Sequence, residues 1–403
     1  MKILLLTDIP PCENYTAGLV LNPLVEFLPL DEIVICSVAN PALEFKIPKT
    51  LNNIPHLKLF KPIEAAMRYK EGKIGGLIAY GFELFNAATV KYFLLPKIIK
   101  FAKEHKVDAI WSVLQGQTII RLTRPLAKKL SVSLFTQIWD PFEWWLRANK
   151  IDRLTQKRLL KEFDAVIKHS TCCATASWAM SESYKTQYDT PTIPLIAGLS
   201  KELARMPATS PHNRYEYIIS IAGQFYAQSE WLSLINALNQ VNWIIAGRKI
   251  KVRVMGQGFQ VFTQLHANFE YLGWRSQEET IRLLAESDLL YMPYWFSEEF
   301  YKESSTSFPS KLVTYFASGR PVFCHAPEYS SPSKYIAENN AGYLCNSLST
   351  DKIIYDLERA IIDAVSYKTF AKNASQCFLR DFILERMQET FFKFLNRNAN
   401  DNK

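Results

Sequence analysis

The feature that most constrains the fold of this chain is a repeated alternation of short apolar runs with amphipathic stretches. In the first half of the chain, six apolar runs have the length and composition of buried strands, and helical patterns lie between them. These predicted strands cover residues 2–7, 33–38, 57–60, 109–113, 132–138 and 165–168. One predicted helix covers 92–106, where Pro96 is expected to delay or kink the start. This alternation predicts a parallel sheet in an α/β domain.

A second series of the same kind begins near residue 217. Its predicted strands cover 217–222, 251–255, 270–272, 288–292 and 321–324, and two of its helices cover 277–286 and 310–317. Another helix is predicted from apolar residues at helical spacing, closed by Gly247. These residues are Trp231, Leu234, Ile235, Leu238, Val241 and Ile245. The second series therefore predicts a second doubly wound α/β domain.

The stretch between the two series is rich in Pro, Ser, Thr and Asn, a composition typical of a linker. A chain of 403 residues has room for two domains of ordinary size, each with its own core. We therefore predict a first domain over 1–200, a linker over 201–214 and a second domain over 215–378.

Charge and cysteine content narrow the class of protein. The formal net charge of +8 is modest, and none of the nucleic-acid recognition motifs occurs, so we expect no nucleic-acid partner. The seven cysteines are odd in number and none has C-x-x-C spacing, so neither a disulfide framework nor a zinc site is indicated. We expect reduced, buried thiols, as in a cytosolic protein.

Two basic stripes with interleaved apolar residues are a possible membrane signal. They are Lys150, Arg153, Lys157, Arg158 and Lys161, and Lys91, Lys97, Lys100 and Lys103. Such stripes suit either a solvated helix face or an anionic membrane surface. The longest apolar stretch, 77–90, contains Glu83 and Asn86 and is not expected to span a bilayer, and the apolar run 3–6 is too short for a signal peptide. We expect a cytoplasmic protein that can lie peripherally at the inner face of a membrane.

The segment 307–322 carries the sharpest chemical signal. Pro309 stands where a helix can begin, Ser310 and Lys311 follow in its first turn, and Gly319 ends it before a strand. Free backbone N–H groups beside a Ser and a Lys can hold a diphosphate. The alternative is an ordinary βαβ unit with a Ser at the helix start, and the local pattern leaves both open.

Here the sequence resembles the GT-B glycosyltransferases, close to glycosyltransferase family 4. Residues 309–322 resemble the donor-site pattern P-S-K-x-x-E-Y-x-A-x-G-x-P-V of that family. Three further stretches follow its order, namely SIAGQFY at 220–226, VMGQG at 254–258 and YLGWR at 271–275. The resemblance covers about 217–345 well. It implies two doubly wound domains facing across a cleft, with a last helix at about 379–397 crossing back onto the first domain.

The resemblance also implies a donor site in the second domain. The residues assigned to it are Gly223, Gln224, Arg253, Gly256, Gly273, Trp274, Ser310, Lys311 and Thr314. Lys311 would neutralise the diphosphate, with Arg253 or Arg275 in support, and Trp274 would stack near the base or fill a core.

The first half fits the family more loosely. Gly18 stands where relatives have a glycine loop after the first strand, and Asp140 ends the strand where many relatives have His-Asp. Asp140 is therefore a candidate catalytic carboxylate, and Glu143 a second, although Asp140 could also cap the next helix and Glu143 could belong to a packed face. In the second half, His325 follows a strand and is expected at the cleft, with a structural role as the alternative.

The chain departs from the family at two positions. Retaining members carry two Glu residues where this sequence has Thr306 and Thr314, so neither position supplies a carboxylate. Glu298, Glu299 and Glu303 in the adjacent loop could supply the missing acid.

The resemblance implies transfer of a sugar from a nucleoside diphosphate to a glycan or lipid-linked acceptor, with a retaining outcome, no metal and no further cofactor. No D-x-D pair occurs, so a metal-dependent GT-A enzyme has no support. A nucleotide-sugar epimerase of the same fold, or an inactive relative that acts as an assembly partner, remain as alternatives.

Overall fold

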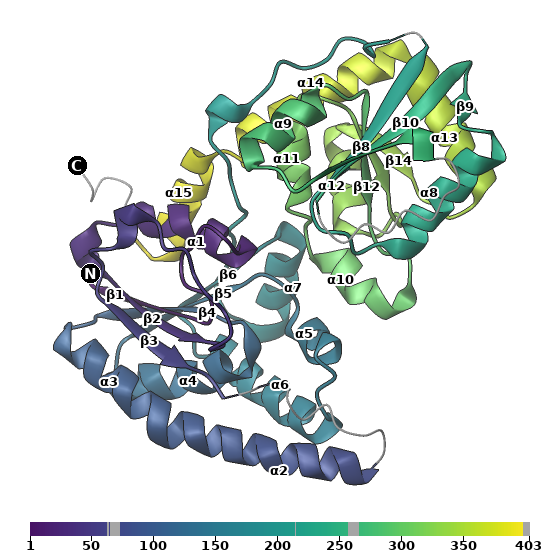
Figure 1. Cartoon of the computed structure of the whole chain (residues 1–403). Helices are drawn as coiled ribbons and strands as arrows, with labels where there is room; N and C mark the ends of the chain where they lie inside the picture. The colour runs from purple at the N-terminus through teal and green to yellow at the C-terminus, as the bar shows by residue number, and fades with distance from the viewer. Residues whose placement is uncertain (63, 65–72, 214, 257–265, 398–403) are drawn as a thin grey trace. The chain divides into compact units, whose positions relative to one another are not determined.

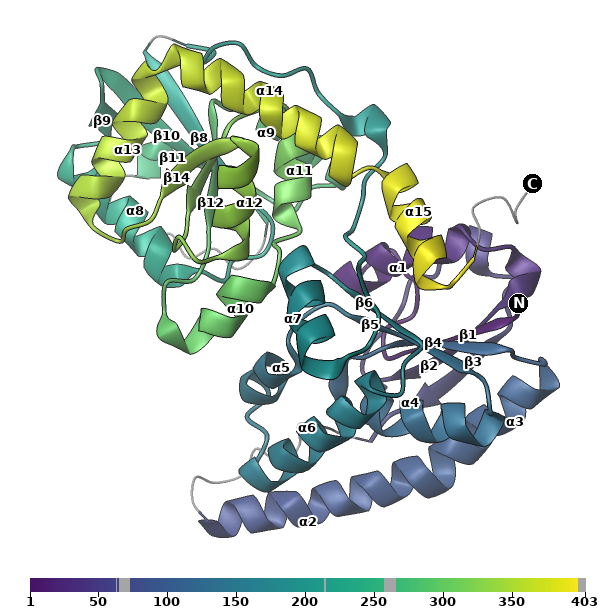
Figure 2. The same ribbon diagram turned by 180° about the vertical axis from the view of Figure 1, so that it is seen from behind.

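The computed structural model describes residues 1–62, 64, 73–213, 215–256 and 266–397. The described chain forms two compact units (Figures 1 and 2). The first unit is Met1–Ile196 with the segment from Gln388 onward, and the second is Ala197–Met387.

The first unit contains a seven-stranded parallel sheet in the order β3-β2-β1-β4-β5-β6-β7. The strands are β1 (Ile3–Thr7), β2 (Ile33–Ala39), β3 (His56–Phe60), β4 (Ala109–Val113), β5 (Ser133–Ile138), β6 (Cys172–Thr175) and β7 (Thr192–Pro194). The helices are α1 (Thr16–Glu26), α2 (Lys73–Thr89), the π-helix η3 (Val90–Leu94), α3 (Leu95–Glu104), α4 (Gly116–Leu130), α5 (Phe142–Ala148), α6 (Arg153–Ile167) and α7 (Trp178–Tyr188). Strands β1, β2 and β4 are buried along their whole length, as expected for a parallel sheet covered on both faces.

The second unit contains another parallel sheet, in the order β11-β10-β8-β12-β13-β14, with β9 added antiparallel to β10. The strands are β8 (Glu216–Ala222), β9 (Ile244–Ile245), β10 (Arg248–Met255), β11 (Phe269–Gly273), β12 (Leu289–Pro293), β13 (Val322–His325) and β14 (Gly342–Cys345). The helices are α8 (Gln228–Gln240), α9 (Gln277–Ala285), α10 (Tyr301–Thr306), α11 (Lys311–Ala317), α12 (Ser331–Asn339), α13 (Thr350–Ile362) and α14 (Ala364–Asp381). The α/β class and the two doubly wound sheets predicted from the sequence are confirmed.

One predicted strand of the first unit is wrong. Residues 165–168 end helix α6 and do not form a strand. The Asp152 carboxylate caps this helix by accepting from the backbone N–H groups of Leu154 and Thr155, and apolar residues at helical spacing bury its inner face. The strand of this region is β6, which begins five residues after the helix ends.

One predicted helix of the second unit is too long. Helix α8 ends at Gln240, and the chain then turns so that Ile244–Ile245 pairs antiparallel with β10. Asn242 and Trp243 of this turn have positive φ, as does Ala246 after β9, and a right-handed helix does not allow this conformation. Gly247, with φ of 74°, therefore closes a hairpin and not a helix.

The segment predicted as a linker, 201–214, makes ordered contacts within the second unit. The backbone N–H of Arg205 donates to Ala317 O, that of Ala208 to Gly319 O, and that of His212 to the Asp288 carboxylate. A side chain at Gly319 would come within 2.5 Å of the Met206 carbonyl oxygen, which explains why the helix is followed by a glycine there.

The last part of the chain forms two helices where the sequence predicted one over 379–397. Helix α14 ends at Asp381, and α15 (Leu384–Phe394) follows. In the first unit, Phe391 packs on Trp111 with 4.8 Å between ring centroids, and Arg397 pairs with Glu32. None of the described helices is long and apolar enough to cross a membrane.

Candidate nucleotide-binding site

Three glycines end three neighbouring strands of the second unit. Gly223 follows β8, Gly256 follows β10 and Gly273 ends β11, with φ values of 97°, 131° and 68°. Backbone hydrogen bonds join these strand ends, from Gly223 N to Met255 O and from Gly256 N to Gly273 O. Backbone in this region of φ favours glycine, so the three positions keep an edge of the sheet free of side chains.

This edge includes the switch point of the second sheet. The strand order reverses between β8 and β12, which pair directly in parallel. In open α/β sheets, ligands bind outside the carboxyl ends of the strands at such a reversal. Gly223 and Gln224 follow β8 at this point, so two predicted donor residues lie where the topology favours a ligand.

Among the described residues, Lys311 is the one cationic side chain that contacts these strand ends. Its Nζ donates to the carbonyl oxygen of Gln224 at 3.2 Å and lies 4.2 Å from the centroid of the Tyr226 ring. A side chain at Gly223 would meet Lys311 Cε at 3.8 Å, so the two residues are close neighbours. Burial by the surrounding protein lowers the pKa of Lys311 to about 7, and no carboxylate among the described residues pairs with it to offset this cost.

Tyr226 belongs to an aromatic cluster that the sequence did not predict. Its ring lies 4.9 Å from that of Trp295 and 6.0 Å from that of Tyr294, and Trp295 Nε1 donates to the Tyr226 carbonyl oxygen. The Tyr226 hydroxyl is buried without a hydrogen-bond partner among the described residues. Burial raises the pKa of this hydroxyl well above its usual value, so it stays a proton donor. The segment SIAGQFY contains this tyrosine, but only the fold brings to it the two aromatic residues that follow β12.

Two other predicted donor residues are Trp274, which follows the strand-end Gly273, and Thr314 on α11. Trp274 is 67% exposed directly after the positive-φ Gly273. Gln277 Nε2 donates to Thr314 Oγ1 at 2.8 Å, which joins α9 to α11. The exposed indole fits the base-stacking alternative and not a core-filling role.

Ser310 is the residue before helix α11, and its side chain is exposed and makes no capping hydrogen bond. The helix itself runs for seven residues, Lys311–Ala317, and begins one residue later than predicted. We therefore assign no special role to the short helix start and keep Lys311 as the main cationic group.

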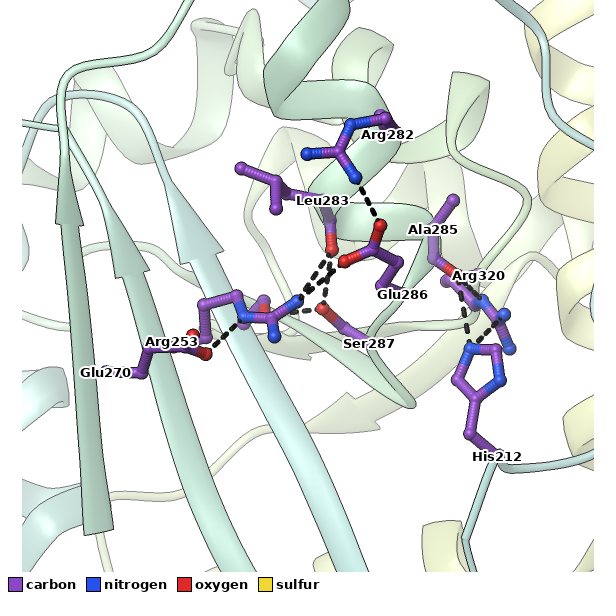
Figure 3. Close-up of polar contacts among 10 residues, drawn as sticks. His212, Arg253, Glu270, Arg282, Leu283, Ala285, Glu286, Ser287 and Arg320 are labelled. Atoms are coloured by element: carbon purple, nitrogen blue, oxygen red, sulfur yellow. Dashed lines mark hydrogen bonds and ion pairs between the residues drawn. The ribbon is translucent and has the colours of Figure 1, made fainter. Parts of the chain in front are cut away.

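Arg253 was predicted to support the diphosphate, but the structure uses it elsewhere. Its guanidinium pairs with Glu270 at 2.6 Å and with Glu286 at 3.7 Å, and donates to the Leu283 carbonyl oxygen at 3.1 Å (Figure 3). Arg253 lies two residues before the carboxyl end of β10. Arg275 pairs with Glu279 at 3.2 Å. Both arginines therefore form ion pairs with nearby glutamates of the second unit.

His325 does not fit the predicted ligand contact. It is 0% exposed, its Nδ1 lies 2.8 Å from the Tyr291 hydroxyl, and its Nε2 lies 2.7 Å from the Ser347 carbonyl oxygen. Burial lowers the pKa of this ring to about 4, so it is neutral at pH 7. Because both ring nitrogens are hydrogen-bonded inside the second unit, the structural alternative holds for His325.

The two threonines at the Glu positions have internal partners. Thr306 Oγ1 donates to the Lys302 carbonyl oxygen at 2.6 Å, and Thr314 accepts from Gln277. Of the three nearby acids, Glu303 is buried in α10, whereas Glu298 and Glu299 are exposed in the preceding turn. The two exposed acids remain the candidates for a substitute carboxylate.

In the first unit, Asp140 is an exposed residue two positions after the end of β5. Asp140 directly precedes Pro141, the N-cap position of α5, so it lies beside the start of the helix that the capping alternative concerns. Glu143 lies in the first turn of α5 and is half-buried. Its neighbour Phe142 stacks on Trp145 at 5.9 Å, so this helix does have the packed face that the alternative for Glu143 described.

Gly18 lies inside helix α1 and not in a loop. A side chain at Gly18 would lie 2.2 Å from Cys12 Sγ, closer than any contact allows. The glycine thus permits the chain after β1 to pack on the first turn of α1. This close approach corrects the predicted glycine loop.

The acids and cation nearest the switch point of the first sheet were not predicted. That sheet reverses between β1 and β4, and Asp8 follows β1 directly. Lys61 Nζ lies 3.5 Å from the Asp8 carboxylate and 2.8 Å from that of Glu64, and Glu64 accepts from the Thr118 N–H at the start of α4. Burial raises the pKa of Asp8 to about 6, with Lys61 opposing the rise. A carboxylate after a strand is too common a pattern for the sequence to single it out.

Metal-ligand clusters are absent from the part of the chain that the structure describes, where no three His, Cys, Asp or Glu side chains could hold an ion. The seven cysteines are all free and buried.

Comparison with known proteins defines the class of fold. No family model matches the chain, and no curated protein matches it in sequence. HepE of Anabaena, solved with UDP, matches with a TM-score of 0.66 and 16% identity over 98% of this chain and 100% of its own. Sucrose-phosphate synthase from Thermosynechococcus elongatus matches with a TM-score of 0.66 and 12% identity over 98% of each chain. The lipopolysaccharide outer core galactosyltransferase WaaB matches with a TM-score of 0.64 and 13% identity over 98% of this chain and 99% of its own.

These similarities span nearly the full length of each protein. At such identities they establish the fold, and the chain has the fold of the GT-B glycosyltransferases. The activity is a separate question that depends on the residues of the site.

Proposed function

We propose that this chain is a glycosyltransferase that binds a nucleoside-diphosphate sugar at the carboxyl edge of the second sheet. The observation that carries the proposal is the position of Lys311, whose side chain lies next to the strand-end Gly223 and whose ammonium donates to the Gln224 carbonyl oxygen. A cation that has no carboxylate partner in the described part of the chain, and that lies beside a strand-end glycine, suits a diphosphate.

Two aromatic residues of the second unit suit the rest of the nucleotide. Trp274 offers an exposed face on which a base can stack, and the buried Tyr226 hydroxyl still has a proton to donate. HepE has been solved with UDP and with UDP-glucose, and we therefore take a uridine diphosphate sugar as the first donor to test.

The transfer itself would break the bond between the sugar and the diphosphate and form a bond to an acceptor hydroxyl. Lys311 in its protonated state would stabilise the charge that develops on the departing diphosphate. We propose Asp140 as the carboxylate that orients the sugar or accepts the hydroxyl proton, since it is exposed just after a strand end. The acceptor would be a glycan or a lipid-linked glycan, and the transfer would be retaining and independent of metal.

Thermal-shift measurements against a panel of nucleoside diphosphates test the binding step, because a ligand of the folded state raises the melting temperature. We expect a rise with UDP or another nucleoside diphosphate and none with the corresponding nucleoside. A panel without any shift would contradict the nucleotide site.

Turnover assays test the reaction class. Donor is incubated alone and with a mixed pool of glycan acceptors, in the presence of a chelator to test metal independence. A transferase releases the diphosphate faster with acceptor, an epimerase converts the donor sugar without acceptor, and an assembly partner does neither. If the protein binds the nucleotide but neither transfers nor converts the sugar, it is an inactive relative that acts as an assembly partner. The threonines at the two Glu positions, Thr306 and Thr314, are the reason to test this alternative.

A further inference from the structure

Helix α2 exposes its most apolar face. Six apolar side chains on it are exposed, and Ile74 and Phe85 reach 76% and 71%. Their spacing places them on one broad side of the helix. The six are Ile74, Leu77, Ile78, Phe82, Leu84 and Phe85.

The opposite side of α2 is the polar one, and it is buried. Of the side chains described on this helix, Glu83 is the one that carries a charge, and it pairs with Arg121 of α4 at 3.1 Å. Gly75 and Ala79 are buried on the same side. Both views show α2 as the outermost helix on its side of the first unit, beyond α4 and α6 (Figures 1 and 2). This orientation reverses the usual pattern of a surface helix, in which the apolar side faces the core.

The exposed apolar row continues into a basic region. Tyr92 and Phe93 of η3 are exposed, and they precede the exposed side chains of Lys97, Lys100 and Lys103 on α3. A shallow groove of about 570 Å³ lies here, lined by Tyr92, Leu95, Pro96 and Ile99 and by lysines that include Lys91 and Lys103. We call the exposed residues of α2, η3 and α3 the α2–α3 face.

We propose that the α2–α3 face docks on a bilayer that contains anionic phospholipid. A helix with an apolar row flanked by lysines lies in the plane of a membrane interface, with its apolar side among the acyl chains and its lysines near anionic headgroups. Exposed Tyr92 and Phe93 lie between the two parts, where aromatic rings prefer the headgroup level. The inference does not depend on the proposed reaction, and it would bring a transferase to lipid-linked acceptors.

A second copy of the chain fits this face less well. A two-fold contact brings the same patch of each subunit together, so its charges must complement themselves. Among the described residues of the α2–α3 face, Glu104 is the one acid, and it already lies 3.8 Å from Lys100. Two copies would therefore oppose lysines with lysines.

The other basic stripe, on α6, has no comparable row of exposed apolar side chains among the described residues. Arg158 pairs with Glu162 at 3.1 Å, and Leu154 is the one large apolar side chain exposed on the described helix. The sequence predicted both stripes, and the structure favours the α2–α3 face because of the apolar row on α2.

Co-sedimentation with vesicles tests the proposal on the full chain. Phosphatidylcholine vesicles are compared with vesicles that also contain phosphatidylglycerol. We expect the wild type to sediment with the anionic vesicles, less so as salt rises. The variant Ile78→Gln/Phe85→Gln should bind at least tenfold more weakly at any salt, and Lys97→Glu/Lys103→Glu should lose the preference for anionic lipid.

The matched control is Lys368→Glu/Lys372→Glu on α14 of the second unit, which makes the same change of charge at exposed positions. It should bind as the wild type does. Equal melting temperatures would show that the variants are folded. A wild type that ignores anionic vesicles, or variants that bind like the control, would overturn the proposal. Loss of a dimer in the apolar variant, with vesicle binding unchanged, would assign the face to a second copy.

Discussion

The two units contain sheets of the same type, but their strand ends are built from different residues. In the second unit, the edge around the switch point consists of glycines with positive φ and one cation, Lys311. In the first unit, the equivalent edge is filled by Asp8, Lys61 and Glu64, which pair with one another. Among the described residues, Lys311 of the second unit has no carboxylate partner. In the first unit, Lys61 pairs with both Asp8 and Glu64. The comparison shows that the same topology can carry different side chains at its switch point, and our proposal places the ligand at the edge of the second unit.

Within the first unit, two aspartates that follow strands differ in exposure. Asp8 is 7% exposed after β1, whereas Asp140 is exposed after β5. An exposed carboxylate can meet a substrate, and a buried, paired one acts mainly on stability. Substituting each by asparagine should therefore give opposite phenotypes.

The largest expected effect is on turnover in Asp140→Asn. If the carboxylate acts as a general base, its loss lowers turnover by about 10²–10⁴-fold, with nucleotide affinity and melting temperature nearly unchanged. Turnover, donor affinity and melting temperature are measured on the same preparation. Unchanged turnover would remove Asp140 from the mechanism.

The next effect is on stability in Asp8→Asn, and it depends on pH. The folded-state pKa of Asp8 is raised to about 6 from 3.8, so the folded protein holds a proton in that window that the unfolded chain has lost. The wild type therefore loses stability as pH rises from about 4 to 6, by up to roughly 3 kcal/mol at about 1.4 kcal/mol per pKa unit. Asparagine cannot ionise, and Lys61 keeps Glu64 as a partner.

Urea unfolding of wild type and Asp8→Asn across this pH range tests the prediction. The variant should gain stability relative to the wild type as pH rises. Two parallel pH profiles would show that Asp8 ionises as freely in the folded protein as in the unfolded chain.

A smaller effect concerns proton uptake on nucleotide binding. The pKa of Lys311 is lowered to about 7, and a bound diphosphate should raise it. Above pH 7, binding should therefore take up a proton, and affinity should fall by up to about tenfold per pH unit. Calorimetry in buffers of different ionisation enthalpy measures this uptake. An absence of proton uptake at pH 8 would contradict the lowered pKa.

From apolar runs between helical patterns, the sequence predicted β1–β5, β8 and β10–β13, but it predicted no strand at β7 or β14. It failed at 165–168, because a short apolar run inside a helix has the same composition as a buried strand. It also failed at Ile244–Ile245, where positive φ at non-glycine residues ends the helix early.

The candidate site was predicted in part. The strand-end glycines and Lys311 follow a pattern that is local in sequence, so they could be found. The Tyr226–Trp295 contact joins residues 69 positions apart, and the ion pairs of Arg253 join separate elements, so neither is visible in a local pattern. The outward face of α2 was missed for a related reason, because apolar periodicity alone does not show which side of a helix meets the core.

The most direct test of the central claim is calorimetric titration of UDP into wild type and Lys311→Ala. The matched control is Lys334→Ala, which removes an exposed lysine from α12 of the same unit. If Lys311 holds the diphosphate, its loss should weaken binding by about 1.5–3 kcal/mol, the range of a charge-assisted hydrogen bond, while the control binds as the wild type does. Wild-type affinity in a folded Lys311→Ala protein would contradict the account of this edge as the nucleotide site.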